Sequence, residues 1–340
     1  MEKNNTQIIA VVGPTATGKT KKALGLAEEA LANDQYAGVD LISVDSRQVY
    51  QGLEVLTGAD VPEGFGRVET PNPTKLAGKQ VQSDAQTVDQ SDRVCFANDD
   101  GSIRIFGISI IKPSDEWSVA HFRQMAREII GKSWAENRLV ILVGGTGLYY
   151  KHLFSDDPQL AVPPNPELRL TLEKLSIDSL QERLEKIDPE KLAQMNASDR
   201  VNKRRLIRAI EVECNTTTTY FDFAPISAQH DDEIQFSNTQ VKQIFLALPL
   251  AELQKKINLR VLERFEGGAI EEVRQLLELS LPSSAPVSST LGVPEITQYI
   301  QNKFTANECQ QLWTLHEYQY AKRQLTWWKK SSSDILSLAV

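Results

Sequence analysis

The chain has 340 residues, 41% of them hydrophobic, with a formal net charge of −8 at pH 7. That length can bury a full core, and it predicts one large domain with a smaller one inserted or appended. The composition and order of residues argue against a membrane span, a signal peptide, a disulfide framework or a zinc knuckle, and only weakly against nonspecific nucleic-acid binding, so we expect a cytoplasmic protein.

The first part of the chain alternates strands and helices. Apolar periodicity predicts strands at 8–12, 40–44 and 139–143 and helices at 19–32 and 119–130. This alternation predicts an α/β fold, with a P-loop NTPase-like parallel sheet flanked by helices. Residues 66–104 form a polar excursion, which we interpret as a long loop or a small β excursion without identifiable chemistry.

The second part of the chain is mainly helical. Helical periodicity from 163 to about 212 predicts a small helical insertion domain, a polar link follows, and a strand at 243–248 returns to the core. Helices are expected at 252–266, 270–279 and 306–330, the second with an apolar packing stripe of Ile270, Val273, Leu276 and Leu277. We therefore divide the chain into a catalytic core (1–160), an insertion (161–238) and a return to the core with C-terminal helices (239–340).

A glycine-rich loop follows the first expected strand. It comprises Gly13, Pro14, Thr15, Ala16, Thr17, Gly18, Lys19 and Thr20. The glycines allow backbone N–H groups to turn onto an anion, Lys19 adds a positive charge, and the Thr20 hydroxyl is placed to ligate Mg²⁺. A plain glycine turn would not need these residues at this spacing.

Ligands of parallel sheets bind beyond the carboxyl ends of the strands, so we expect the loops GPTATGKT, SVDSRQVY and VGGTGLYY to converge on one crevice. Asp45 at one strand tip could be a Mg²⁺ ligand, a general base or a helix cap. Thr146 at another could bond to Asp45, to a substrate amine or to its own turn.

Two basic clusters stand out. The first contains Arg200, Lys203, Arg204, Arg205 and Arg208, where Arg200, Arg204 and Arg208 would share one helix face. The second places Lys322, Arg323, Lys329 and Lys330 around Trp327 and Trp328. Either could be a solvated face, with Glu211 or Glu213 pairing to the first, but beside a phosphate loop both favour RNA binding.

The motifs GPTATGKT, VDSRQVYQGLEVLTGAD, EWSVAHFR, LVGGTGLYY, RRLIRAIEV and QYAKRQLTWW occur in the order typical of the tRNA dimethylallyltransferases, or tRNA isopentenyltransferases. The chain resembles this family over nearly its whole length except 66–104. It lacks the C-terminal zinc finger of eukaryotic relatives and is identified as bacterial in type.

The resemblance implies transfer of a dimethylallyl group from dimethylallyl diphosphate to the exocyclic N6 amine of the adenosine 3′-adjacent to the tRNA anticodon. It assigns diphosphate and Mg²⁺ to the loop 13–20, the general base to Asp45 and orientation of the amine to Thr146. Arg260 would join Lys19 on the diphosphate, although Arg264 lies close by. The tRNA-binding residues would be Asp45, Ser46, Arg47, Gln48, Thr146, Arg169, Arg204, Arg205, Leu206, Ile207, Arg208, Lys322 and Arg323.

Three departures from the family pattern affect the expected RNA surface. The chain reads IRIFGISIIKP where relatives carry HHL, it has Gly292, Val293, Pro294 and Glu295 where a tyrosine usually follows the glycine, and Tyr318 replaces an arginine. We expect an active enzyme with an altered RNA surface.

Two alternatives stay open: an isopentenyltransferase of free adenine nucleotides, and a P-loop small-molecule kinase that would bind ATP with its γ-phosphate at Lys19. The sequence predicts a monomer that requires Mg²⁺ and leaves open which tRNAs are modified, the exact prenyl donor and the role of 66–104.

Overall fold

The computed structural model describes residues 7–59, 61–69, 94–155, 157–218, 236, 239–283 and 285–335. The chain divides into two compact units, Met1–Ser155 with Ile234–Val340 and Asp156–Glu233. Within the described ranges, no helix is long and apolar enough to span a bilayer. Part of the polar excursion, 70–93, and most of the polar link before 236 lie outside these ranges.

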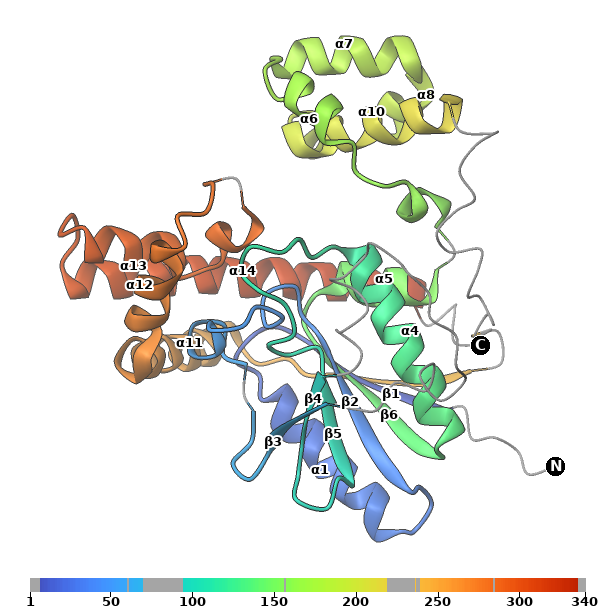
Figure 1. Cartoon of the computed structure of the whole chain (residues 1–340), viewed down its shortest axis with the longest axis vertical. Coiled ribbons are helices and arrows are strands. Elements are labelled where there is room, and N and C mark those ends of the chain that lie inside the picture. Colours follow the sequence, from blue (N-terminus) through green and yellow to red (C-terminus); the bar gives the residue numbers. More distant parts are fainter. Residues whose placement is uncertain are drawn as a thin grey trace. The chain divides into compact units, whose positions relative to one another are not determined.

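The first unit is built on a seven-stranded sheet of order β3-β4-β5-β2-β6-β1-β7 (Figure 1). The strands are β1 (Gln7–Val12), β2 (Gly38–Val44), β3 (Gly66–Glu69), β4 (Val94–Ala97), β5 (Ile103–Phe106), β6 (Arg138–Gly144) and β7 (Gln240–Phe245). From β5 to β7 all pairs are parallel, whereas β3 and β4 add an antiparallel edge. The predicted α/β fold is confirmed, and the polar excursion ends in β5, a strand of the main sheet that the sequence analysis missed.

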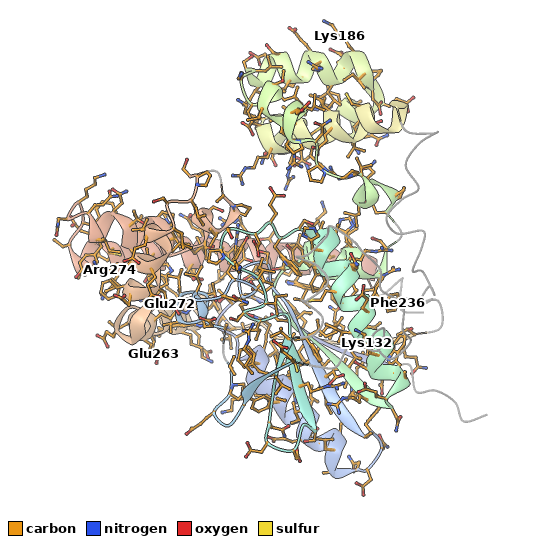
Figure 2. The ribbon with its side chains drawn as sticks, viewed as in Figure 1. Lys132, Lys186, Phe236, Glu263, Glu272 and Arg274 are labelled. Atoms are coloured by element: carbon orange, nitrogen blue, oxygen red, sulfur yellow. The ribbon has the colours of Figure 1, made fainter. Side chains whose placement is uncertain are left out.

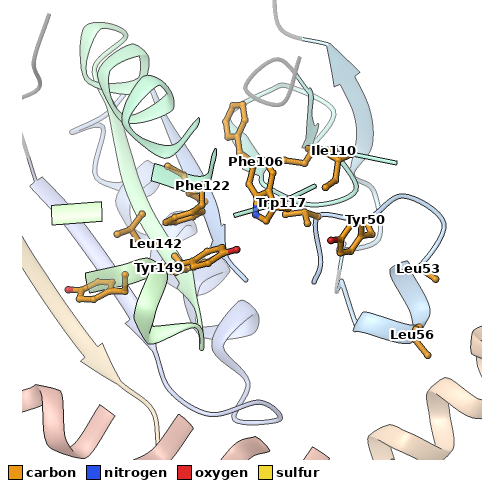
Figure 3. Packing of buried hydrophobic residues seen from close by; sticks show 14 of the residues in the cluster. Tyr50, Leu53, Leu56, Phe106, Ile110, Trp117, Phe122, Leu142 and Tyr149 are labelled. Atoms are coloured by element: carbon orange, nitrogen blue, oxygen red, sulfur yellow. The ribbon is translucent and has the colours of Figure 1, made fainter. Parts of the chain in front are cut away.

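Helices cover both faces of this sheet. Helix α1 (Lys19–Ala32) packs on one face, where Ala23 and Ala27 join a cluster with Leu41, Ile105 and Val143. Helices α4 (Val119–Ala135) and α5 (Gly147–Phe154) pack on the other face. There the labelled side chains of Figure 3, among them Phe122, Leu142 and Tyr149, form a larger buried cluster. Side chains of β2 and β6 point alternately to the two faces of the sheet, so both strands contribute to two separate buried cores.

The remaining elements of this unit surround the carboxyl edge of the sheet. They are α2 (Glu54–Thr57), α11 (Leu250–Arg264), the π-helical turn η4 (Phe265–Ala269), α12 (Ile270–Glu278), the 3₁₀ turn η5 (Pro286–Ser289), α13 (Val293–Ile300) and α14 (Ala306–Ile335). The sequence analysis missed α13 and placed β7 about three residues late. The packing stripe on α12 is correct for Val273 and Leu276, which are buried, but wrong for Leu277, which is 39% exposed.

In the second unit, the regular elements of the described residues are all helical. It contains the turn η1 (Pro158–Ala161), α6 (Pro166–Leu172), α7 (Ile177–Ile187), α8 (Pro189–Gln194), α9 (Ala197–Arg200) and α10 (Lys203–Thr218). Its core joins Leu172, Leu180, Leu184 and Leu206. Because Arg200 ends α9 and α10 starts at Lys203, the predicted shared face is wrong for Arg200, whereas Arg204 and Arg208 lie one turn apart on α10.

A buried ion cluster joins three strands near their amino ends. The fully buried carboxylate of Asp40 on β2 accepts two hydrogen bonds from Arg104 on β5, at 2.8 and 2.7 Å, and one from Arg138 on β6 at 2.8 Å. The hydroxyl of Ser133 on α4 donates a further bond at 2.7 Å. A second Arg138 nitrogen, Nη2, donates to backbone carbonyls, including that of Ser102 at 3.0 Å. Each buried charge is therefore paired, as burial requires.

We predict that Asp40→Ala strongly destabilises the first unit, because it leaves two guanidinium groups without their buried counter-charge. The expected loss is about 3–5 kcal/mol. All five tryptophans lie in this unit, so tryptophan fluorescence during urea unfolding reports on it alone. Glu136→Gln, which removes only a 53%-exposed partner of Arg104, should cost under about 1 kcal/mol. Equal losses in both variants would contradict the central role of Asp40.

Candidate active site

Three strands of the sheet end at the same level. Gly144 on β6 pairs with Val12 on β1 and with Val44 on β2, so the chain leaves the sheet side by side at Gly13, Asp45 and Gly145. These loops border one cavity of about 1110 Å³. Its lining includes Thr15, Ala16, Gly18, Lys19, Thr20, Asp45, Ser46, Arg47, Gln48, Gly144, Gly145, Arg260, Arg264, Glu317, Tyr320, Arg323 and Gln324. The predicted convergence of the three loops is confirmed.

The first of these loops has the backbone geometry of an anion cradle. Gly13 has φ 147°, and a Cβ there would lie 2.2 Å from the carbonyl oxygen of Leu246, so glycine is required for this close approach. Gly18 precedes α1 with no side-chain cap, which leaves the first N–H groups of a 14-residue helix directed at the cavity. Lys19 Nζ and the Thr17 hydroxyl both donate to the carbonyl of Pro14, at 2.6 and 2.9 Å. The Lys19 side chain thus folds back over its own loop.

Asp45 lies half-buried at the tip of β2. Its Oδ1 accepts from the backbone N–H groups of Arg47 and Gln48 at 2.8 and 3.3 Å. The helix-cap alternative is wrong, because residues 46–49 form bends and turns and the next helix is α2. The carboxylate instead closes an Asx-type turn through Oδ1, and within the described part of the chain Oδ2 accepts no hydrogen bond. This turn holds the carboxylate in a fixed orientation at the cavity wall.

The two residues that follow Ser46 are held by contacts with other elements. The guanidinium of Arg47 donates to the carbonyl of Pro286 at 2.5 Å and to the Ser289 hydroxyl at 3.1 Å, so it joins this loop to η5. The Gln48 amide accepts from the Ser43 hydroxyl at 2.8 Å and donates to the carbonyl of Gly58 at 2.8 Å. Gln48 is thereby held in a single orientation at the cavity wall.

The structure distinguishes the two arginines on α11. Arg260 Nη1 donates to the Thr15 hydroxyl in the phosphate loop at 2.9 Å, and Nη2 donates to the carbonyl of Gly58 at 3.0 Å. Arg264 is 7% exposed and forms an ion pair with Glu317 at 3.0 Å. Arg260 is therefore the arginine that reaches the loop.

Helix α14 supplies site residues that the sequence analysis missed. Gln324 Oε1 accepts from the backbone N–H of Thr15 at 2.9 Å, and the indole of Trp328 lies 3.4 Å from the carbonyl oxygen of Gly145. Tyr320, Gln324 and Trp328 follow one another at four-residue spacing, which puts them on one helix face. This four-residue spacing is the signal in the sequence by which they could have been found. Trp328 is fully buried, whereas Trp327 of the same cluster is only partly buried.

Thr146 is not among the lining residues of the cavity. Its hydroxyl is buried beside the phenol of Tyr320, which does line it. Burial, and after it the negative charge of Asp45, raises the pKa of Tyr320, so the phenol keeps its proton at neutral pH. Tyr320 therefore brings a phenol from α14 to the cavity that Asp45 also lines.

Two cations of α14 lie over aromatic rings. Lys322 Nζ is 5.6 Å from the centroid of Tyr318, and the guanidinium carbon of Arg323 is 5.8 Å from that of Tyr320. Tyr318, which replaces the family arginine, thus carries a cation above its ring. At the other two departures, Ile110 and Ile111 are buried in the core, and the carboxylate of Glu295 accepts from the N–H of Gly292 at 2.9 Å.

Members of the first basic cluster bind partners within the second unit. Arg169 and Arg208 both bind the buried carboxylate of Glu211, at 2.9 and 2.6 Å, which confirms Glu211 as a partner of this cluster. Arg205 pairs with Asp199, and Arg204 is exposed.

The expectation that Leu206 and Ile207 contact tRNA is wrong for their side chains. They are 0% and 4% exposed, because α10 turns this face into the core of the unit.

Comparisons with known proteins agree over most of the chain. A family model described as IPP transferase matches residues 97–331. A tRNA dimethylallyltransferase from an Exiguobacterium species is 31% identical over 328 residues, covering 95% of this chain and 88% of its own. Another, from Methylobacterium nodulans, is 32% identical over 328 residues, covering 94% and 91%.

Solved structures of other proteins share the fold of this chain. That of a tRNA isopentenylpyrophosphate transferase from Bacillus halodurans is 26% identical, with a TM-score of 0.55 over 95% of this chain and 87% of its own. A eukaryotic dimethylallyltransferase described as acting on tRNA is 19% identical and shares the fold, with a TM-score of 0.62 over 95% and 70%.

We predict that Glu211→Gln loosens the second unit, because Arg169, Arg208 and the N–H of Asn165 all bind this carboxylate. Burial alone would raise the pKa of Glu211, but these bonds outweigh it and hold the pKa below its usual value. The stabilisation is therefore present above the unfolded-state pKa and is lost as pH falls through the folded one.

Amide hydrogen exchange of α10 checks this prediction. Protection at pH 7 should fall by about 2 kcal/mol in the variant. Glu182→Gln, at an exposed position on the neighbouring helix α7, serves as the control. Unchanged α10 protection in Glu211→Gln would contradict the prediction.

Proposed function

The chain belongs to the IPP transferase family, and on that basis we propose that it transfers a dimethylallyl group from dimethylallyl diphosphate to the N6 amine of the adenosine 3′-adjacent to a tRNA anticodon. One observation carries the proposal at the level of the site: Asp45 shares a single cavity with the phosphate loop and Arg260. A base for the amine and donors for the leaving diphosphate thus face the same space.

The donor side would be formed by the loop 13–20, Lys19 and Arg260. Displacement at an allylic carbon leaves negative charge on the departing diphosphate, and inward N–H groups with two cations stabilise it. Arg260 already touches the loop at the Thr15 hydroxyl. When diphosphate binds there, Lys19 and Arg260 would release their protein acceptors and donate to phosphate oxygens instead.

The residues fit a Mg²⁺ ion. The Thr20 hydroxyl lies at the cavity wall beside Lys19, and a hard cation takes such an oxygen together with diphosphate oxygens and water. When bound, Mg²⁺ would neutralise part of the charge on the diphosphate. The side chains of the phosphate loop and Arg260 would hold the dimethylallyl diphosphate in place around the ion.

On the acceptor side, the N6 amine attacks C1 of the dimethylallyl group. The new N–C bond forms as the C1–O bond breaks, its electron pair leaves with the diphosphate, and Asp45 takes one amine proton. The orientation of Asp45 by the N–H groups of Arg47 and Gln48 suits this base role. Thr146, placed beside Tyr320, would help to orient the amine through that phenol.

A stacked anticodon base cannot reach this cavity, so the nucleotide would be flipped out of its loop, with Ser46, Arg47 and Gln48 along its path. Lys322 and Arg323 on α14, and Arg204 with Arg205, Arg208 and Arg169 on the insertion, are the proposed backbone contacts. We propose that the protein works as a cytoplasmic monomer. The family comparisons favour tRNA over free nucleotides and over a kinase activity.

Asp45→Asn should reduce transfer of label from radiolabelled dimethylallyl diphosphate to unmodified tRNA by about 10²- to 10⁴-fold, because the base is lost while the shape is kept. The assay contains Mg²⁺ and measures single-turnover rates. Asp99→Asn, the same change at an exposed position, is the control and should keep full activity. Full activity in Asp45→Asn would exclude it as the base.

The same assay with AMP in place of tRNA, and with ATP as donor, separates the alternatives. Label in tRNA alone supports the proposal. Label in AMP would make the protein a nucleotide prenyltransferase, and phosphoryl transfer from ATP without prenyl transfer would make it a kinase.

Arg260→Ala should raise KM for dimethylallyl diphosphate about tenfold or more while leaving KM for tRNA within about twofold, because a charge-assisted bond to the leaving group is lost. Arg264→Ala should act on stability instead, since it leaves the buried Glu317 carboxylate without its partner. Steady-state kinetics and thermal unfolding of both variants check this. A donor-specific KM effect in Arg264→Ala alone would reverse the assignment.

A further inference from the structure

One backbone carbonyl joins the two sides of the proposed site. The carbonyl oxygen of Gly58 accepts from Arg260 Nη2 at 3.0 Å and from Gln48 Nε2 at 2.8 Å. Arg260 belongs to the proposed diphosphate side, and Gln48 to the proposed nucleotide side. The position of this single oxygen therefore fixes both side chains relative to each other.

The space at Gly58 is occupied by arginine. Gly58 follows α2 with φ 58° and ψ 49°, a left-handed conformation. A Cβ at this position would lie 2.2 Å from Nη2 of Arg260 and 2.2 Å from Nη2 of Arg264. Any side chain would displace the guanidinium groups from their carbonyl acceptors. Glycine is therefore needed here both for the left-handed turn and for the space that the arginines occupy.

The short helix before Gly58 is held from a distant element. The carboxylate of Glu272 on α12, labelled in Figure 2, accepts from the N–H groups of Val55 and Leu56 at 2.8 and 2.7 Å. Burial raises the pKa of Glu272 despite these two bonds. Helix α2 is thus anchored at its start by Glu272, and its end presents the carbonyls of Thr57 and Gly58 to Arg264 and Arg260.

We propose that Gly58 is a positioning residue of the transfer reaction, whose carbonyl aligns Arg260 for diphosphate and Gln48 for the nucleotide, and whose missing side chain gives Arg260 its place. This inference rests on the proposed function. Gly58 acts through Arg260 and Gln48 and touches neither substrate.

The decisive variant is Gly58→Ala, compared with Gly52→Ala. Gly52 has φ 73° in the same segment, but a Cβ there meets nothing within 4 Å. Both variants carry the strain of an L side chain in the left-handed region, and only the first displaces Arg260. The dissociation constant of inorganic pyrophosphate with Mg²⁺, measured by calorimetry, should rise about tenfold in Gly58→Ala and less than about twofold in Gly52→Ala.

A double-mutant cycle separates positioning from general loosening. If Gly58 acts through Arg260, adding Gly58→Ala to Arg260→Ala should change the pyrophosphate dissociation constant by less than about threefold. KM for tRNA should rise in Gly58→Ala through Gln48. Additive losses, or equal effects of Gly58→Ala and Gly52→Ala, would overturn the inference.

Should Gly58→Ala fail to fold, Glu272→Ala tests the same alignment from the other end of α2. It should weaken pyrophosphate binding several-fold, whereas Glu271→Ala, at an exposed neighbour that pairs with Arg274, should not. Equal binding by both variants would overturn the inference. Failure of the proposed function has a different signature, because the unaltered protein would then transfer no prenyl group to tRNA.

Discussion

The shared level at which β1, β6 and β2 end is the constraint on which the rest of the site depends. Parallel pairing of Val12 and Val44 with the same residue, Gly144, delivers the phosphate loop, Asp45 and Gly145 to one edge. A Cβ at Gly144 would lie 2.2 Å from the carbonyl of Val44, so the strands approach closely at this point. A cradle for an anion and a carboxylate thereby face one cavity without either loop having to extend.

The two ends of the sheet treat charge in opposite ways. At the amino end, Asp40 is fully buried and bound by Arg104 and Arg138, so its charge fixes the packing of three strands. At the carboxyl end, Asp45 is half-buried and gives one oxygen to backbone N–H groups. A carboxylate whose oxygens are all hydrogen-bonded within the protein stabilises the fold, whereas one with an oxygen left over can take part in a reaction.

The C-terminal helices complete the site from positions far along the chain. Thr15 receives a bond from Arg260 on α11 and gives one to Gln324 on α14, across 245 and 309 residues of sequence. The carbonyl of Gly58 then joins Arg260 to Gln48, so the proposed donor and acceptor sides form one hydrogen-bonded wall. Such a wall needs the sheet, α2, α11 and α14 to be folded together, which couples catalysis to the integrity of this unit.

The sequence by itself determined the α/β fold, the bounds of α1, the phosphate loop and the position of Asp45, because these depend on local periodicity and on residue spacing within a few turns. It missed β5 and α13, and it assigned Leu206 and Ile207 to RNA although α10 buries them. Only the tertiary structure decided that Arg260 and not Arg264 reaches the loop, that Gln324 and Tyr320 belong to the cavity, and that Gly58 joins its two sides. Those choices depend on which helix faces meet across long stretches of chain, and the local pattern of residues does not contain that information.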